Sequence, residues 1–202
     1  MNAEFLVDIF EAAGAFSEGD LAPIQRLLPN IARQDVLEGM PILFHVARSR
    51  AIFDFLDGNH VNFLQRNERT GDTFLHCATL DRDAALFEQA VAWYATRRLL
   101  DEPNRSGITA LSAALKFGLI ARTEKLIDAG ANMSTVAANG LTPIRQALYC
   151  LDGEDAAIAG LNVLLRRGVE VSRDEALRLK QFASDLGRSA VGKWLDGHLK
   201  FD

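Results

Sequence analysis

One short block of sequence recurs along the chain, and its spacing constrains the fold more than any other feature. The block begins at Gly71, Gly107 and Gly140, each followed two residues later by threonine, and a weaker copy begins at Gly39. Successive glycines are 32, 36 and 33 residues apart. Because sequence periods of roughly 20–50 residues indicate repeated structural units, we expect a stack of similar units.

The residues inside each block are suited to begin a helix and to pack it. The hydroxyl groups of Thr73, Thr109 and Thr142 can each cap the N-terminus of a helix, and the alanine five residues later lets paired helices approach closely. The glycine before each threonine is expected in a turn that disfavours a Cβ atom. Gly118 and Gly130 are expected to end helices with positive φ.

This block resembles the first half of the ankyrin repeat, Gly-x-Thr-Pro-Leu-His-x-Ala, whose second helix ends in Leu-Leu-x-x-Gly-Ala. Counterparts of that ending occur at residues 125–132 and 163–171, and in eroded form at 55–62. The resemblance implies an all-α, ankyrin-type solenoid of stacked helix-turn-helix repeats with short hairpin-like connecting turns. Abundant leucine (28) and alanine (29), with few β-branched residues, also favour helices.

The resemblance covers nearly the whole chain and predicts a single ankyrin repeat domain, residues 1–202, of roughly five to six repeats. The complete repeats are expected at about residues 34–66, 67–103, 104–136 and 137–171. Atypical caps are expected at about residues 1–33 and 172–202, because the ends of a solenoid need a polar outer face.

Each cap is expected to contain a helix pair. In the N-terminal cap the first helix is expected at residues 3–15, followed by a second that includes residues 21–28. In the C-terminal cap, Ser172 and Glu175 form a capping-box pattern, Gly187 is placed to end that helix, and a last helix is expected over about 189–200.

Two departures from the repeat pattern have alternative interpretations. Residues 87–101 predict a longer helix whose Trp93 and Tyr94 pack on the outer face, or else form a second binding patch that could self-associate. Residues 149–160 add about five residues and three acids, which we interpret as a solvated loop or as an acidic contact for a basic partner. Their spacing does not fit a calcium-binding EF-hand. A third departure, residues 62–70, lengthens one connection.

The sequence predicts no catalytic residue, no metal site and no cofactor. Phosphate-binding glycine loops, zinc-ligand spacings and nucleophile motifs are absent. His76 and Cys77 are adjacent, so on a helix they point about 100° apart and cannot form a nucleophile–base pair. The resemblance instead gives His76 a structural hydrogen-bonding role.

The resemblance implies a protein partner, held in a concave groove by the turn tips and the first helices. The family's variable positions fall on Arg69, Thr70, Asp72, Leu80, Asp81, Arg105, Ser106, Ile108, Lys116, Phe117, Asn139, Leu141 and Tyr149, with Arg48 and Ser49 in the second unit. Phe117 and Tyr149 are candidate anchors, because buried aromatic side chains often dominate interfaces. Arg69 and Arg105 occupy equivalent positions and would form a short basic ladder.

The net charge and the first residues of the chain indicate which partners and which cellular compartment to expect. The net charge is −5 and the pI about 5.4, which argues against nucleic acid. No apolar run approaches the roughly 20 residues that span a bilayer, and the acidic first residues are unlike an export signal. We therefore expect a monomeric cytoplasmic protein with reduced cysteines, no membrane partner and no small-molecule substrate.

Several functions remain open at this point. The leading hypothesis is a non-enzymatic interaction module, with a bacterial inhibitor, immunity-like protein or regulator as its sharper form. A second hypothesis is an effector delivered into a host cell by a non-Sec route. A third is an enzyme with an unrecognised site near residues 149–160, built on Tyr149, Asp152, Glu154 and Asp155.

Overall fold

The computed structural model describes residue 9 and residues 21–199, and the chain divides into two compact units. The first unit comprises residues up to 97 together with 103–105, and the second comprises residues 98–102 and those from 106 onward. The helix expected at residues 3–15 lies outside the described residues, apart from Ile9. None of the described helices is long and apolar enough to cross a bilayer.

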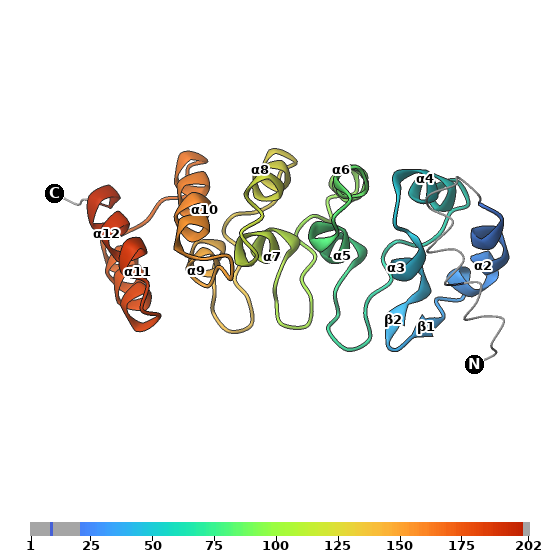
Figure 1. Cartoon of the computed structure of the whole chain (residues 1–202), viewed down its shortest axis with the longest axis horizontal. Helices are drawn as coiled ribbons and strands as arrows, with labels where there is room; N and C mark the ends of the chain where they lie inside the picture. Colours follow the sequence, from blue (N-terminus) through green and yellow to red (C-terminus); the bar gives the residue numbers. More distant parts are fainter. Residues whose placement is uncertain (1–8, 10–20, 200–202) are drawn as a thin grey trace. The chain divides into compact units, whose positions relative to one another are not determined.

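The first unit contains one short hairpin and helices arranged in pairs (Figure 1). Its elements in chain order are α2 (Ala22–Ala32), β1 (Val36–Leu37), β2 (Met40–Pro41), α3 (Ile42–Val46), α4 (Arg50–Gly58), α5 (Phe74–Leu80) and α6 (Ala84–Thr96). β1 and β2 pair in antiparallel fashion. α6 is long, as expected, and packs on α4 and α5.

Aromatic side chains fill much of the interior of the first unit. The rings of Phe53 and Phe63 stack at 4.2 Å, and Tyr94 is fully buried with its hydroxyl donating to the Phe63 carbonyl at 2.8 Å. Trp93 is half-buried, and its indole N–H donates to Asp57 Oδ1 at 2.8 Å. Both aromatic side chains pack against the unit, but Tyr94 lies in the interior and not on the outer face as expected, so it offers no surface for self-association.

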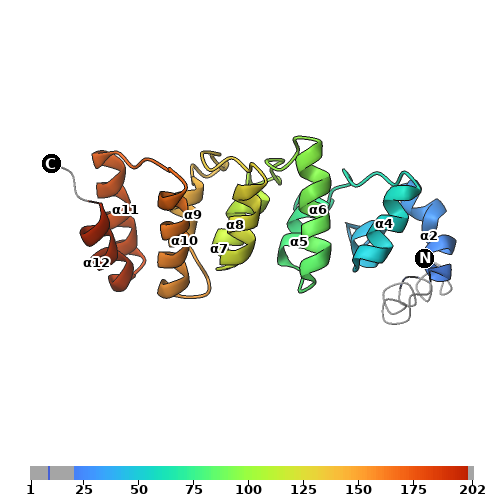
Figure 2. The same cartoon turned by 90° about the horizontal axis from the view of Figure 1, so that it is seen from above.

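The second unit consists of three helix pairs (Figure 2). They are α7 (Ala110–Lys116) with α8 (Ile120–Asp128), α9 (Pro143–Leu148) with α10 (Glu154–Arg166), and α11 (Arg173–Asp185) with α12 (Ser189–His198). Each pair is in contact, and α9 also contacts α7 and α11. The buried side chains of this unit are mainly leucine, alanine and valine, so small residues allow the close helix packing expected from the sequence.

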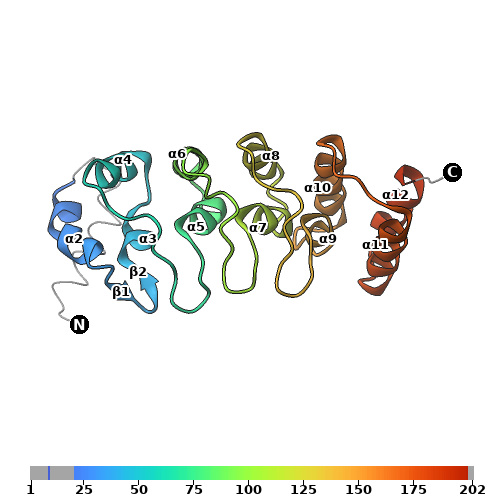
Figure 3. The same ribbon diagram turned by 180° about the vertical axis from the view of Figure 1, so that it is seen from behind.

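Loops that precede the first helix of a pair extend away from the helices as turn tips (Figure 3). Neighbouring tips are joined through their backbones. In the first unit the Arg105 N–H donates to the Thr70 carbonyl at 3.0 Å, and in the second unit the Ala138 N–H donates to the Ser106 carbonyl at 3.0 Å. The tips at Gly71 and at Gly107 are thus each fixed by a backbone hydrogen bond from the tip that follows.

The glycines of the repeated block adopt the expected left-handed conformation, with φ of 73° at Gly71, 74° at Gly107 and 78° at Gly140. At Gly71 and Gly107 the backbone of the next tip also lies so close that a side chain would not fit. A Cβ atom on Gly71 would lie 2.9 Å from the backbone nitrogen of Arg105, and one on Gly107 would lie 2.5 Å from that of Ala138. Glycine is therefore needed there for both conformation and space.

The threonine caps are confirmed at two of three positions. Thr73 accepts from the backbone N–H of His76 at 3.4 Å, and Thr109 accepts from that of Ser112 at 3.3 Å. The expectation for Thr142 is wrong, because its hydroxyl is buried and makes no hydrogen bond to any described residue. α9 begins with proline, whose fixed φ already suits the first helical position and replaces the need for a cap.

Candidate protein-binding surface

Some of the predicted contact residues at the tips of the first unit are exposed, and others are hydrogen-bonded within the turns. Arg69 and Arg105 are exposed. Asp72, in contrast, accepts hydrogen bonds from the Thr70 hydroxyl at 2.6 Å and from Asn104 Nδ2 at 2.8 Å. Thr70 and Asp72 therefore stabilise the turn, which leaves the two arginines as the side chains available to a partner.

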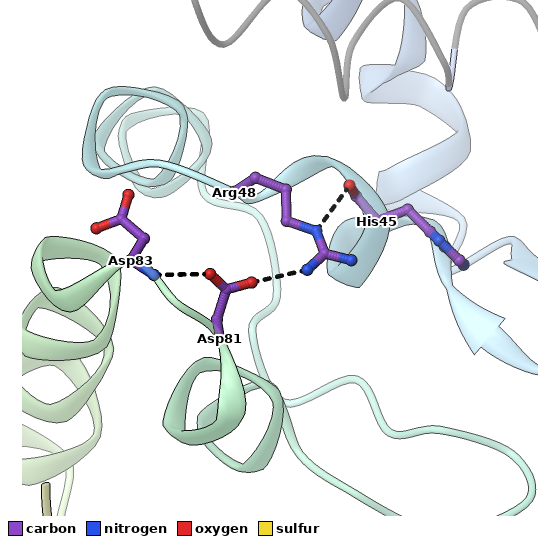
Figure 4. Close-up of polar contacts among 4 residues, drawn as sticks. All are labelled: His45, Arg48, Asp81 and Asp83. Carbon is purple, nitrogen blue, oxygen red and sulfur yellow. Dashed lines mark hydrogen bonds and ion pairs between the residues drawn. The ribbon is translucent and has the colours of Figure 1, made fainter.

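Two further candidates in the first unit neutralise each other (Figure 4). Arg48 Nη1 lies 2.7 Å from Asp81 Oδ2, and the other oxygen of Asp81 accepts from the Asp83 N–H at 2.9 Å. Arg48 Nε also donates to the His45 carbonyl at 3.3 Å. Leu80, next to this network, is 46% exposed. This part of the surface presents an apolar side chain rather than a free charge.

A polar hollow of 350 Å³ lies against the tips of the first unit. Its lining residues are Arg66, Asn67, Glu68, Gly71, Pro103, Asn104 and Arg105. Arg66 reaches across it, because its guanidinium donates to the Pro103 carbonyl at 2.7 Å and to the Gly71 carbonyl at 3.1 Å. The hollow joins two neighbouring tips, and Arg105 is its one predicted contact residue.

In the second unit, exposed apolar side chains gather at the C-terminal ends of α7 and α9. Phe117 is 40% exposed and Leu151 is 66% exposed. The Leu151 N–H donates to the Lys116 carbonyl at 2.7 Å, and the Lys116 ammonium lies 5.9 Å from the Phe117 ring. Phe117 is thus partly exposed rather than part of the core, with Lys116 beside it. Ser106 is exposed and Ile108 is half-buried at the tip before α7.

A larger hollow of 430 Å³ lies between α9, the tip before it, and α11. Its lining residues are Asn139, Gly140, Leu141, Arg145, Tyr149, Arg178, Leu179 and Phe182. It brings together the three predicted contacts of the fifth unit, namely Asn139, Leu141 and Tyr149. We call it the α9–α11 hollow.

The floor of the α9–α11 hollow is apolar and aromatic. The rings of Tyr149 and Phe182 meet edge to face at 4.9 Å, and Leu179 is fully buried beside them. Tyr149 and Phe182 are half-buried, so part of each ring faces the hollow. The arrangement can receive a large apolar side chain in contact with two ring edges.

Charged groups at the rim make the hollow electropositive. Arg145 donates two hydrogen bonds to Glu175, at 2.7 and 2.6 Å, and these bonds lower the pKa of the Glu175 carboxyl and raise the pKa of Arg145. Arg178 is exposed and forms no ion pair with any described residue. Arg178 also acts electrostatically on Glu175 and helps to lower the pKa of its carboxyl, so this end of the hollow has two arginines for one glutamate.

Sequence reasoning missed the contribution of α11 to this hollow. Arg178 and Phe182 lie one helical turn apart on α11, a spacing that places both on one helix face and was available in the sequence. Glu175 was assigned to a capping box. Ser172 does cap α11 by accepting from the Glu175 N–H at 3.2 Å, but the Glu175 carboxylate turns to Arg145 instead.

The acids of residues 149–160 do not gather into a buried site. Asp152 and Asp155 are exposed, and Glu154 Oε2 accepts from the Val191 N–H at 2.9 Å. Among the described residues no group of three potential metal ligands lies together. The expectation of a loop over residues 149–160 is therefore correct only up to residue 153, because α10 begins at Glu154 and places Glu154 and Asp155 in its first turn, where Glu154 supports α12.

The histidine and cysteine of α5 have structural surroundings. His76 Nδ1 lies 2.8 Å from the Thr73 hydroxyl and accepts from the Thr73 N–H at 3.2 Å, which completes a capping box. Burial raises the pKa of the Cys77 thiol to about 12, so the thiol stays protonated at neutral pH. The predicted structural role of His76 is confirmed.

Comparison with known proteins identifies the fold. No family model matches the chain, and no curated protein matches it. A solved ankyrin repeat domain from Acinetobacter baumannii AYE is similar to it, with 21% identity, a TM-score of 0.67, and coverage of 93% of this chain and 95% of that one. The helix pairs, the glycine turns and this likeness together show that the chain has the all-α ankyrin repeat fold.

Proposed function

We propose that the chain is a non-enzymatic protein-interaction module that binds a protein partner through its turn tips and first helices. The ankyrin repeat fold implies interaction with proteins in general, since its stacked units form extended surfaces. The observation that carries the proposal for this chain is the α9–α11 hollow, where three predicted contact residues surround a partly open aromatic floor. Partly exposed aromatic side chains in such a recess are typical interface anchors.

The chemistry of the described side chains supports a binding role over catalysis. The Cys77 thiol has a raised pKa, and His76 is committed to capping α5. Asp152 and Asp155 point to solvent rather than into a shared pocket, whereas perturbed carboxylates in a cleft are typical of acid–base catalysis. The enzyme hypothesis for residues 149–160 therefore has no supporting geometry.

In its sharper form the proposal is an inhibitor, immunity-like protein or regulator that acts in the cytoplasm by covering a partner's surface. The candidate contact residues are spread over tips and helix ends, as in a face that docks on a protein. An effector delivered into a host cell would use the same face. The two differ in which cell contains the partner.

The experiment is an affinity pull-down from lysate of the source organism with wild type and with a Phe117→Ala, Tyr149→Ala double variant. Leu177→Ala is the matched control, because Leu177 is 59% exposed on α11 but does not line the hollow. Circular dichroism first establishes that all three proteins fold. We expect one protein to be retained by wild type and by the control, and lost by the double variant.

Two other outcomes count against the proposal as stated. If all three proteins retain the same partner equally, the binding face does not include Phe117 and Tyr149. Retention of nothing from the source lysate, with specific retention from a host lysate, would replace the inhibitor with the delivered effector.

A further inference from the structure

The hydrogen-bonded series of tips stops at Asn139. At Gly71 and Gly107 the residue just before the block glycine offers its carbonyl to the next tip, as Thr70 does to Arg105 and Ser106 does to Ala138, while at the weaker copy Gly39 itself accepts from the Glu68 N–H. Asn139 holds the equivalent position before Gly140. Its carbonyl accepts no hydrogen bond from any residue that the structure describes. An exposed, unpaired carbonyl therefore stands where the next tip would attach.

The space beside this carbonyl is open because α11 follows α10 without a tip. Residues 167–172 connect the two helices directly. A Cβ atom on Gly140 would meet no atom within 4 Å, whereas at Gly107 it would meet the Ala138 backbone nitrogen at 2.5 Å. Asn139 and Gly140 both line the α9–α11 hollow. The hollow thus adjoins the position of a missing tip.

The side chains around this position select a particular chemistry. Tyr149, Leu179 and Phe182 provide an apolar floor, and Arg178, exposed and close enough to Glu175 to help lower the pKa of its carboxyl, provides a second cation at the rim beside Arg145. Arg145 is already neutralised by Glu175. Two arginines and one glutamate leave a local positive charge at the rim, which favours an anionic partner group.

We propose that the α9–α11 hollow binds an extended segment of a partner protein in place of the missing tip, and that this segment carries a large apolar side chain next to Asp or Glu. The apolar side chain packs on Tyr149 and Phe182, and the carboxylate pairs with Arg178. A backbone N–H of the segment donates to the Asn139 carbonyl, as in other modes that extend an existing backbone ladder. This inference rests on the proposed function and specifies its partner.

The test is selection of a displayed library of random short peptides on the immobilised full chain. Wild type is compared with Arg178→Glu and with Arg173→Glu, an equal charge reversal on the same helix at an exposed residue outside the hollow. We expect wild type and Arg173→Glu to enrich peptides with an aromatic residue or leucine beside an acid. Arg178→Glu is expected to lose the acidic preference and to weaken the best wild-type peptide by about tenfold or more.

A second measurement examines the backbone contact, with the best wild-type peptide synthesised as a series carrying a single N-methyl group at each position in turn. Loss of about tenfold in affinity is expected at one position near the apolar side chain, since removal of that N–H leaves the Asn139 carbonyl unpaired. Equal affinity across the series would overturn the tip-replacement mode.

The remaining outcomes separate this inference from the proposed function. Enrichment of basic peptides, enrichment that is the same on Arg178→Glu as on wild type, or no enrichment at all would overturn the inference. If the pull-down nevertheless gives a partner that depends on Phe117 and Tyr149, the interaction module stands with a different partner chemistry. If the pull-down also retains no partner that depends on Phe117 and Tyr149, both the inference and the proposed function are wrong.

Discussion

Two turns of the same sequence type, around Gly107 and Gly140, differ in what lies beside them. Both glycines have nearly the same φ, 74° and 78°. The turn at Gly107 is covered by the backbone of Ala137 and Ala138, whereas a Cβ atom on Gly140 would have no neighbour within 4 Å. The repeated block therefore encodes the conformation of a turn, and the sequence that follows decides whether the turn is covered or open to a partner.

Replacing each glycine with alanine separates conformation from coverage, and this comparison carries the largest expected effect. Gly140→Ala suffers only the left-handed backbone strain, and we expect a loss of about 1–2 kcal/mol in the free energy of unfolding. Gly107→Ala adds a clash with the Ala138 backbone, and we expect a loss of about 3 kcal/mol or more. Urea unfolding followed by circular dichroism measures both.

Equal losses for the two variants would contradict the comparison, because they would mean that the neighbouring tip contributes nothing at Gly107. The slope of the free energy against urea concentration is the internal control. It must stay constant for the difference to be assigned to the folded state.

Substitutions of Thr109 and Thr142, two residues after these glycines, are expected to differ in stability in the same way but by less. Thr109→Val removes a hydroxyl that caps α7 at 3.3 Å, and we expect it to cost about 1 kcal/mol. Thr142→Val removes a hydroxyl that is buried without a partner among the described residues, and we expect little change or a slight gain. Thermal unfolding of both variants checks the prediction, which fails if Thr142→Val is the more damaging of the two.

These contrasts indicate what the sequence could predict. Local rules placed the glycine turns and most helix boundaries, because φ preference and capping depend on neighbours in the chain. They failed at Thr142, where a proline already begins the helix. The repeat pattern predicted only the hollow residues on α9 and the tip before it. Arg178 and Phe182 line the hollow because α11 packs against α9, a contact between residues some 30 positions apart that local rules do not describe.

The same dependence on packing explains Glu175, which a local pattern assigned to a capping box and the fold assigns to Arg145. This pair joins α9 to α11 beside the open turn. Both side chains are about a quarter exposed, and we therefore expect Glu175→Gln to cost less than about 1 kcal/mol at neutral pH.

The pH dependence of stability sharpens that last expectation. Hydrogen bonds from Arg145 lower the pKa of Glu175 in the folded chain below its ordinary value of 4.5, so between those two pKa values the unfolded chain binds more protons than the folded one. The stabilisation by Glu175 is therefore complete above about pH 4.5 and is lost as the pH falls through the lowered folded pKa. Urea unfolding between pH 7 and pH 3 is expected to give a shallower acid loss for Glu175→Gln than for wild type.

The matched control for this titration is Asp155→Asn, at an exposed acid with no ion pair to a described residue. Its stability is expected to follow that of wild type across the same pH range, because Asp155 is exposed and forms no ion pair with a described residue that the substitution could remove. Parallel curves for Glu175→Gln and wild type would show that the Arg145–Glu175 pair contributes nothing to holding α11 beside the open turn.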